Sequence, residues 1–321
     1  MVLRNPNDIL SRTNIVDLEE LLSMKGCNSL LYKLENDCLK IEISSKGAEL
    51  MSVMGKTDGY QYLWQGDPQI WGKRSPLLFP IIGNLNQGKY LYRGKEYALG
   101  LHGFAAKMDF CPCEAGEKSV TFSLSHDSTT LREYPFEFRL LVTFTLQEKM
   151  LTTVYRVENT GNQTLWFSIG GHPGFNCSLT LDGRKNVGLV FEKVETVSRL
   201  VNESGYLTGR EEPFLKGQNI VDVASLDFDG KKKVVALKGF TSENVIMEDR
   251  GNGKMVMVRM AGFPFLGIWS PTNQAPFLCI EPWYGITATF GVNEELDKKQ
   301  GIQELQAGNN FTCGYDIVCL K

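Results

Sequence analysis

The chain has 321 residues and a formal net charge of −3 at pH 7, with 42% hydrophobic and 22% charged residues. This length and composition allow a substantial buried core and are ordinary for a globular protein. The small net charge gives no electrostatic reason to expect nucleic acid or an anionic membrane as a partner.

The first 26 residues contain no long apolar run and carry acidic residues throughout. They therefore predict neither a secretory signal nor a membrane span. Residues 14–24 predict a short amphipathic helix that ends near Gly26. Its apolar face consists of Ile15, Leu18, Leu21 and Leu22. We therefore expect an N-terminal helical extension over residues 1–28 and a single domain over residues 29–321.

From Leu30 onward the pattern changes to short segments rich in Val, Ile, Thr, Tyr and Phe, bounded by Gly, Asn and Asp. Such segments are typical of strands. They comprise residues 39–44, 119–125, 138–146, 151–159, 164–170, 234–239, 255–260, 265–269 and 277–281. The clearest hairpin joins residues 137–146 to 150–159 through a polar turn at 147–149. Residues 294–305 form the one late helical candidate, interrupted by Gly301. The fold class expected is all-β, with large, mostly antiparallel, packed sheets.

Eight cysteines are scattered along the chain. Without a signal peptide, this distribution favours reduced thiols and a cytoplasmic location over a disulfide framework. The Cys111–Cys113 pair is too short and too isolated to indicate a metal site.

The three histidines differ in their surroundings. His126 lies in the polar stretch SHDST and is expected in a solvated loop. His102 lies between glycines and apolar residues in LGLHGFA. His172 follows a predicted strand in FSIGGHPGFN, where glycines and a proline constrain the backbone. From context alone, His102 and His172 are either satisfied core residues or functional groups.

Glu281 ends the apolar run FLCIE and precedes PWYG. A carboxylate placed there should have a raised pKa unless it is well hydrogen-bonded. A buried glutamate paired with an arginine is the structural alternative. An earlier block, residues 62–85, places the charged side chain of Arg74 among aromatic rings. Its guanidinium group either binds the substrate through paired hydrogen bonds or stacks on an aromatic ring in a structural role. This block contains Trp64, Trp71, Arg74, Phe79 and Asn84.

Other chemistries lack support in the sequence. The chain contains no G-x-S-x-G elbow, P-loop, H-E-x-x-H or G-x-G-x-x-G after a strand. A metal held by His102, His172 and Glu281 is formally possible, but the spacing does not favour it. We therefore expect no metal and no cofactor.

Four motifs together resemble the aldose 1-epimerase (galactose mutarotase-like) family, and its LacX-type bacterial branch in particular. They are the block WGKRSPLLFPIIGNL, then LHGF, GGHPGFN and IEPWYG, in that order. The resemblance covers residues 30 to 319 and leaves the N-terminal helix as an addition. It implies a β-supersandwich with an open sugar cleft and a cofactor-free mechanism that interconverts the α and β anomers of an aldohexose.

The resemblance also implies roles for individual residues. Glu281 matches the family's catalytic base and His172 its catalytic acid. Arg74 and His102 match substrate-binding residues. Phe79 or Trp283 would offer an apolar face to the sugar, and Asn84 of the same block completes the expected binding set.

The chain departs from the larger sugar mutarotases at one position. Their substrate-binding aspartate aligns near Lys233, with Asp227 and Asp229 a few residues away. Residues 231–233 form a basic run, which is either a solvated turn or a phosphate-binding cluster. A hexose-6-phosphate 1-epimerase and a non-catalytic carbohydrate-binding or sensor protein therefore stay as alternatives. A small-molecule sugar is the expected partner, and a homodimer remains compatible with the sequence.

Overall fold

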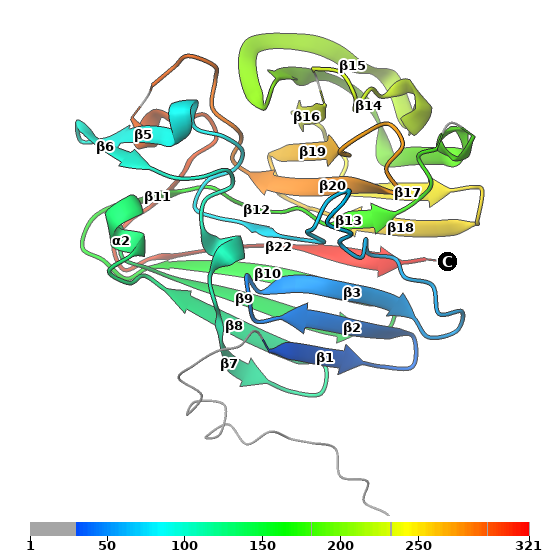
Figure 1. Cartoon of the computed structure of the whole chain (residues 1–321), viewed down its shortest axis with the longest axis horizontal. Coiled ribbons are helices and arrows are strands. Elements are labelled where there is room, and N and C mark those ends of the chain that lie inside the picture. Colours follow the sequence, from blue (N-terminus) through cyan, green and yellow to red (C-terminus); the bar gives the residue numbers. More distant parts are fainter. Residues whose placement is uncertain (1–29, 181, 232, 294, 321) are drawn as a thin grey trace, which may run out of the picture.

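The computed structural model describes residues 30–180, 182–231, 233–293 and 295–320. Strands dominate this part of the chain, and its one α-helix, α2, has four residues, Thr130–Glu133 (Figure 1). Short 3-10 turns occur at Asn86–Gly88, Ala105–Lys107, Gly183–Asn186, Val223–Ser225 and Leu296–Lys298. The all-β prediction is therefore confirmed. The predicted helix at residues 14–24 lies outside the described residues.

One antiparallel sheet of 15 strands forms most of the fold. Thirteen of its strands follow a single path, in the order β4 (Leu77–Leu78), β12 (Ile169–Gly171), β20 (Phe277–Tyr284), β19 (Phe265–Trp269), β16 (Val234–Lys238), β14 (Val187–Glu203), β17 (Asn244–Asp249), β18 (Lys254–Arg259), β22 (Asn310–Cys319), β10 (Met150–Asn159), β9 (Phe138–Gln147), β8 (Ser119–Ser125) and β7 (Cys111–Ala115). Off this path, β13 (Gly174–Asn176) pairs with β20, and β15 (Tyr206–Asp222) pairs with β14. Strands from distant parts of the chain therefore meet at β20, which carries Glu281.

Three smaller sheets complete the described fold. The first contains β1 (Leu31–Glu35), β2 (Leu39–Ser44) and β3 (Glu49–Gly55). The others pair β5 (Lys89–Tyr92) with β6 (Lys95–Ala98), and β11 (Leu165–Phe167) with β21 (Gln303–Leu305). The β1–β3 sheet lies over the β7–β10 part of the large sheet, as Figure 1 shows. The ring of Tyr32 meets that of Phe122 edge to face, with centroids 5.0 Å apart.

Alternation of apolar and polar residues accounts for the core. In β2 the odd-numbered side chains, Ile41 and Ile43 among them, are buried, while their neighbours are partly exposed. Strand β9 follows the same period of two. Buried faces from both sheets form one continuous apolar cluster. Because apolar burial is the main stabilising contribution to folding, this cluster holds the two layers together.

Two sequence-based expectations need correction. Residues 294–305 do not form a helix: in the described part, a 3-10 turn is followed by β21. Leu305 is buried opposite Leu165 in a two-stranded sheet, so tertiary pairing outweighs the local helical pattern. The predicted strand at 164–170 divides into β11 and β12, which belong to different sheets. The hairpin predicted at residues 137–159 is confirmed as β9 and β10.

Phe122→Ala tests the packing of the two sheets. Phe122 is fully buried and contacts both Tyr32 and Phe144. Its truncation should lower the free energy of unfolding by about 3–5 kcal/mol, because a large cavity replaces the ring. Urea denaturation measures this loss. Phe290, whose exposed fraction is 73%, provides the matched control: Phe290→Ala should change stability by less than about 1 kcal/mol. Equal losses in the two variants would contradict the packing described.

Candidate active site

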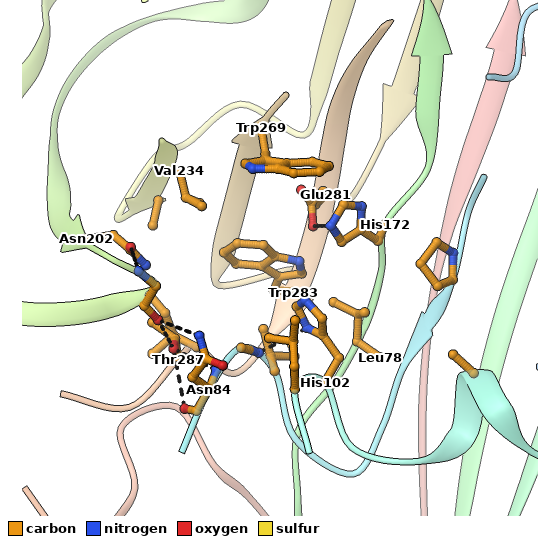
Figure 2. Close-up of a pocket in the computed structure, with 18 of the residues that line it drawn as sticks. Leu78, Asn84, His102, His172, Asn202, Val234, Trp269, Glu281, Trp283 and Thr287 are labelled. Carbon is orange, nitrogen blue, oxygen red and sulfur yellow. Dashed lines mark hydrogen bonds and ion pairs between the residues drawn. The ribbon is translucent and has the colours of Figure 1, made fainter. Parts of the chain in front are cut away.

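A cavity of about 400 Å³ opens beside β20 and is lined mainly by apolar and aromatic side chains (Figure 2). Its floor is a separate apolar cluster that includes Leu78, Ala236, Trp283 and Ile286. Among these side chains lie a few polar groups, including His102, His172 and Glu281. Concave, mostly apolar cavities with a few convergent polar groups are typical of small-molecule sites.

His172 and Glu281 form a close pair at one wall of this cavity. Nε2 of His172 lies 3.2 Å from Oε2 of Glu281. The short strand β12 brings them together, because Gly170 pairs with Trp283 on β20. A Cβ atom on Gly170 would lie 2.8 Å from the Pro282 carbonyl oxygen, and one on Gly171 would lie 2.7 Å from the Tyr315 ring. The first two glycines of GGHPGFN are therefore needed for this close approach.

Burial controls the charge of this pair. Glu281 and His172 are 1% and 7% exposed. The Trp71 and Trp269 rings lie 5.0 and 5.3 Å from the His172 ring. Loss of water raises the pKa of Glu281 well above 4.5, although the Trp283 side chain opposes this shift. Burial, followed by the influence of His102, lowers the pKa of His172 well below 6.5. The pair therefore favours a neutral carboxyl group beside a neutral imidazole over an ion pair.

His102 approaches the same region from a loop. Its backbone has φ of 60°, a left-handed conformation that histidine adopts more often than most residues. The Gly83 N–H donates to Nδ1 of His102 at 3.0 Å. Because Nδ1 accepts this bond and burial lowers the pKa of His102 to about 4, the ring is neutral and carries its proton on Nε2. His102 can therefore donate a hydrogen bond from Nε2, and its ring lies 5.7 Å from that of His172.

A second polar group of the lining consists of Asn84, Asn202, Gly205 and Thr287. Asn84, Asn202 and Thr287 are labelled on the left of Figure 2. The backbone N–H of Asn84 donates to Oγ1 of Thr287 at 2.9 Å, and this hydroxyl donates to the Gly205 carbonyl at 2.7 Å. Nδ2 of Asn84 donates to the same carbonyl at 3.3 Å. These bonds join three segments that are far apart in the sequence into one rim of the cavity.

Five of the seven predicted site residues line the cavity: Asn84, His102, His172, Glu281 and Trp283. Phe79 does not, because it is fully buried in the core against Phe104 and Phe138. The prediction that Phe79 contacts a sugar is therefore wrong. Of the two aromatic residues proposed for that contact, Phe79 and Trp283, only Trp283 lines the cavity.

Arg74 also lies away from the cavity lining. Its backbone N–H donates to Oε1 of Glu49 at 2.8 Å, and its guanidinium group packs over Gly66. Nε of Arg74 is buried without a hydrogen-bond partner among the described residues. The neighbouring Lys73 is the basic side chain of this segment that lines the cavity. The sequence located the segment correctly but not the direction of each side chain.

The acidic residues considered as replacements for the family's aspartate do not reach the cavity. Asp227 and Asp229 are exposed and form a turn with Asn273. Lys233 is exposed too, and the next residue, Val234, lines the cavity. An apolar wall therefore occupies the region where the alignment had placed a carboxylate.

Sequence reasoning missed several residues that line the cavity: Lys73, Lys107, Asn202, Val234, Trp269 and Thr287. Trp269 ends a correctly predicted strand, so its position could have been inferred. Thr287 carries no local signal, because it bonds Gly205 across the fold. Asn202 bonds Gly205 within its own turn, but nothing in that turn indicates that it reaches the cavity.

The pair also belongs to a cluster that could hold a cation. The nearest ligand atoms of His172, Cys279 and Glu281 all lie within 4.8 Å of one another. Nitrogen, sulfur and carboxylate oxygen together match the donor preferences of zinc. His102, which the sequence had offered as the third member, is replaced by Cys279 in this cluster.

Comparison with known proteins agrees with this geometry. The sequence profile of the aldose 1-epimerase family matches residues 30–302. The chain belongs to the aldose 1-epimerase family. It is 34% identical over 303 residues to the plasmid-encoded protein LacX of Lactococcus lactis subsp. lactis, covering 91% of this chain and 100% of that protein.

Solved structures of family members show the same fold. A galactose mutarotase related enzyme from Lactobacillus acidophilus has a TM-score of 0.85 and 30% identity, over 91% of this chain and 98% of that one. A galactose mutarotase-like protein from Lactobacillus casei has the same TM-score and identity, over 90% and 100% of the two chains. The galactose mutarotase-like fold expected from the motifs is therefore confirmed. Among the described residues, no helix is long and apolar enough to cross a membrane.

Gly83→Ala tests the loop that positions His102. Gly83 has φ of 72°, and an added Cβ would lie 2.3 Å from Cβ of Thr287. Gly253 has nearly the same φ, 73°, but open space around the added atom. Both substitutions should incur the backbone cost of about 1 kcal/mol, and only Gly83→Ala should add a clash. Thermal unfolding should show a larger loss of stability for Gly83→Ala. Equal losses would show that the Gly83–Thr287 contact relaxes freely.

Proposed function

We propose that this protein is an aldose 1-epimerase that interconverts the α and β anomers of an aldohexose by opening and reclosing the ring. The observation that carries the proposal is the buried His172–Glu281 pair, whose Nε2 and Oε2 atoms are 3.2 Å apart at the wall of a sugar-sized cavity. Ring opening needs a base for the C1 hydroxyl proton and an acid for the ring oxygen. Two coupled groups at one wall can supply both.

The number of protons that His172 and Glu281 hold between them suits this reaction. Ring opening and closing consume no net proton, so the pair needs one proton in total. In the empty site that proton favours Glu281, because burial disfavours the charged form of both groups. Moving it to His172 creates the carboxylate that accepts the C1 proton and the imidazolium that protonates the ring oxygen. The two residues exchange roles when the ring closes.

The surrounding side chains support binding and orientation. His102 donates from Nε2, as its bond from Gly83 requires. Trp71, Trp269 and Trp283 offer flat apolar faces, which suit the C–H faces of a pyranose. The same faces exclude water, which strengthens each polar contact made within the cavity.

A phosphorylated aldohexose is a second candidate substrate, favoured by Lys73 and Lys107, which both line the cavity. Lys107 has no carboxylate within 4 Å in the described part of the chain, whereas Nζ of Lys73 lies 3.6 Å from Oε2 of Glu49. Because Glu49 already offsets the charge of one lysine, a neutral aldohexose remains the leading proposal. Exchange measurements with hexose 6-phosphates beside the free sugars separate the two. A sugar-binding or sensor protein would accelerate neither.

Glu281→Gln and His172→Ala test the chemistry. Each should lower kcat/KM for anomer exchange by roughly 10²–10⁴-fold, the usual contribution of a positioned proton transfer. NMR exchange spectroscopy or polarimetry of freshly dissolved α-sugars measures this rate. His126 lies outside the cavity lining, so His126→Ala should leave the rate within about twofold. Unchanged turnover in Glu281→Gln would exclude the mechanism.

The pH profile tests the charge state of the pair. Low pH adds a second proton, chiefly to His172, whose pKa is lowered well below 6.5 by burial and by His102. The rate should therefore stay level as the pH falls through 6.5 and decline only under more acidic conditions. High pH removes the shared proton, so the alkaline decline should belong to the coupled pair. Stopped-flow polarimetry measures kcat/KM across this range. An acid limb centred at 6.5 would contradict the burial of His172.

A further inference from the structure

The orientations of Asn84 and Asn202 are fixed by a single residue, Gly205. Nδ2 of Asn84 faces the Gly205 carbonyl, which only accepts, at 3.3 Å. Oδ1 of Asn202 faces the Gly205 N–H, which only donates, at 3.2 Å. Neither carboxamide can flip without losing its bond, so the network settles which atom is oxygen and which is nitrogen.

Each carboxamide therefore leaves one atom for a ligand. Oδ1 of Asn84 is an acceptor and Nδ2 of Asn202 is a donor, and neither has a hydrogen-bond partner among the described residues. Both residues line the cavity, and Asn202 is only 5% exposed. Each of these two atoms can therefore form a hydrogen bond with a ligand in the cavity.

The wall beside these atoms is apolar. Leu200 pairs with Ala236 between β14 and β16, and Val234, two residues before Ala236, lines the cavity on the same side as Asn202 (Figure 2). Ile286, fully buried, belongs to the same apolar cluster. A hydroxyl group could engage the donor and the acceptor but would leave this wall without a partner. An anionic group would be repelled by Oδ1 of Asn84.

We propose that this end of the cavity is a subsite for a secondary amide carried by the sugar, most simply an acetamido group. Its N–H would donate to Oδ1 of Asn84, its carbonyl would accept from Nδ2 of Asn202, and its methyl group would pack on Val234, Ala236 and Ile286. The cavity of about 400 Å³ lies in the range that encloses drug-sized ligands, which are larger than one unsubstituted hexose. This inference rests on the proposed epimerase function and names its substrate class.

The first experiment compares anomer exchange of three 2-acetamido sugars, N-acetylglucosamine, N-acetylgalactosamine and N-acetylmannosamine, with that of glucose, galactose and mannose. The wild-type protein should favour at least one acetamido sugar over its parent by about tenfold or more in kcat/KM. Acceleration of the parent sugars without any acetamido preference would overturn the subsite and leave the epimerase proposal standing.

Asn202→Asp is the matched variant. It keeps Oδ1 as the acceptor for the Gly205 N–H but replaces the Nδ2 donor with an oxygen that repels the amide carbonyl. The ratio of kcat/KM for the acetamido sugar to kcat/KM for its parent sugar should therefore fall to about one. An equal loss for both sugar classes would overturn the proposal, because it would mean a general effect on the site.

A binding measurement tests the subsite without relying on catalytic turnover. Saturation-transfer NMR on Glu281→Gln with N-acetylglucosamine and its two isomers should give the strongest transfer at the acetyl methyl group, and Asn202→Asp in the same background should weaken it. Methyl transfer in a protein that accelerates no sugar would support the subsite and reject the epimerase function. No binding, or strongest transfer at ring protons, would overturn the subsite.

Discussion

The burial of one carboxyl group determines much of the chemistry of this site. Glu281 lies on β20, between β12 and β19 in the large antiparallel sheet, and is 1% exposed, with its Oε2 3.2 Å from Nε2 of His172. Desolvation of an ionised carboxylate is so unfavourable that the group either pairs closely or takes up a proton. Here both responses are available, because His172 can share that proton. Loss of either partner would leave the other buried alone, so the two depend on each other for stability as well as for chemistry.

The sheet supplies this environment through close backbone contacts. Strand β12 is only three residues long, yet it lies between β4 and β20 and carries two glycines that allow the strands and side chains to approach. Directly after it, the chain delivers His172 to the wall of the cavity. Elsewhere in the cavity lining, the hydrogen bond from the Gly83 N–H to Nδ1 of His102 fixes the tautomer of the neutral His102 imidazole. Backbone geometry therefore sets the protonation of the site as much as side-chain charge does.

The strands with regular alternation were predictable from the sequence. Strands β2, β8 and β19 were predicted with the bounds observed, and β9 and β10 within a residue. In β2, β9 and β10 the buried face leaves a period of two in the sequence, whereas β19 is marked by a short continuous apolar run. The long strands β14 and β15 were not predicted. The run GREEPFLKGQNI in β15 is largely exposed, so its sequence carries little alternation.

The site was predictable only in part, for a physical reason. His172 and Glu281 are marked by their own surroundings, since glycines or apolar residues flank each one closely. Phe79 and Arg74 lie in a segment that approaches the cavity, but the irregular backbone around β4 does not reveal which side chains turn inward. Thr287 bonds Gly205, which is 82 residues away, and no local pattern indicates such a contact. Asn202 bonds Gly205 within one turn, but the sequence of that turn does not show that it faces the cavity.

The two ends of the cavity are built from different kinds of structure. The His172–Glu281 pair lies on or directly beside strands inside the sheet, where any shift disturbs many neighbours. The rim formed by Asn84, Asn202, Gly205 and Thr287 includes the turn between β14 and β15, at Ser204 and Gly205. Turns tolerate substitution and changes of length far better than central strands do. Changes in the hairpin tip could therefore alter which ligand the cavity accepts, while the His172–Glu281 pair stayed the same.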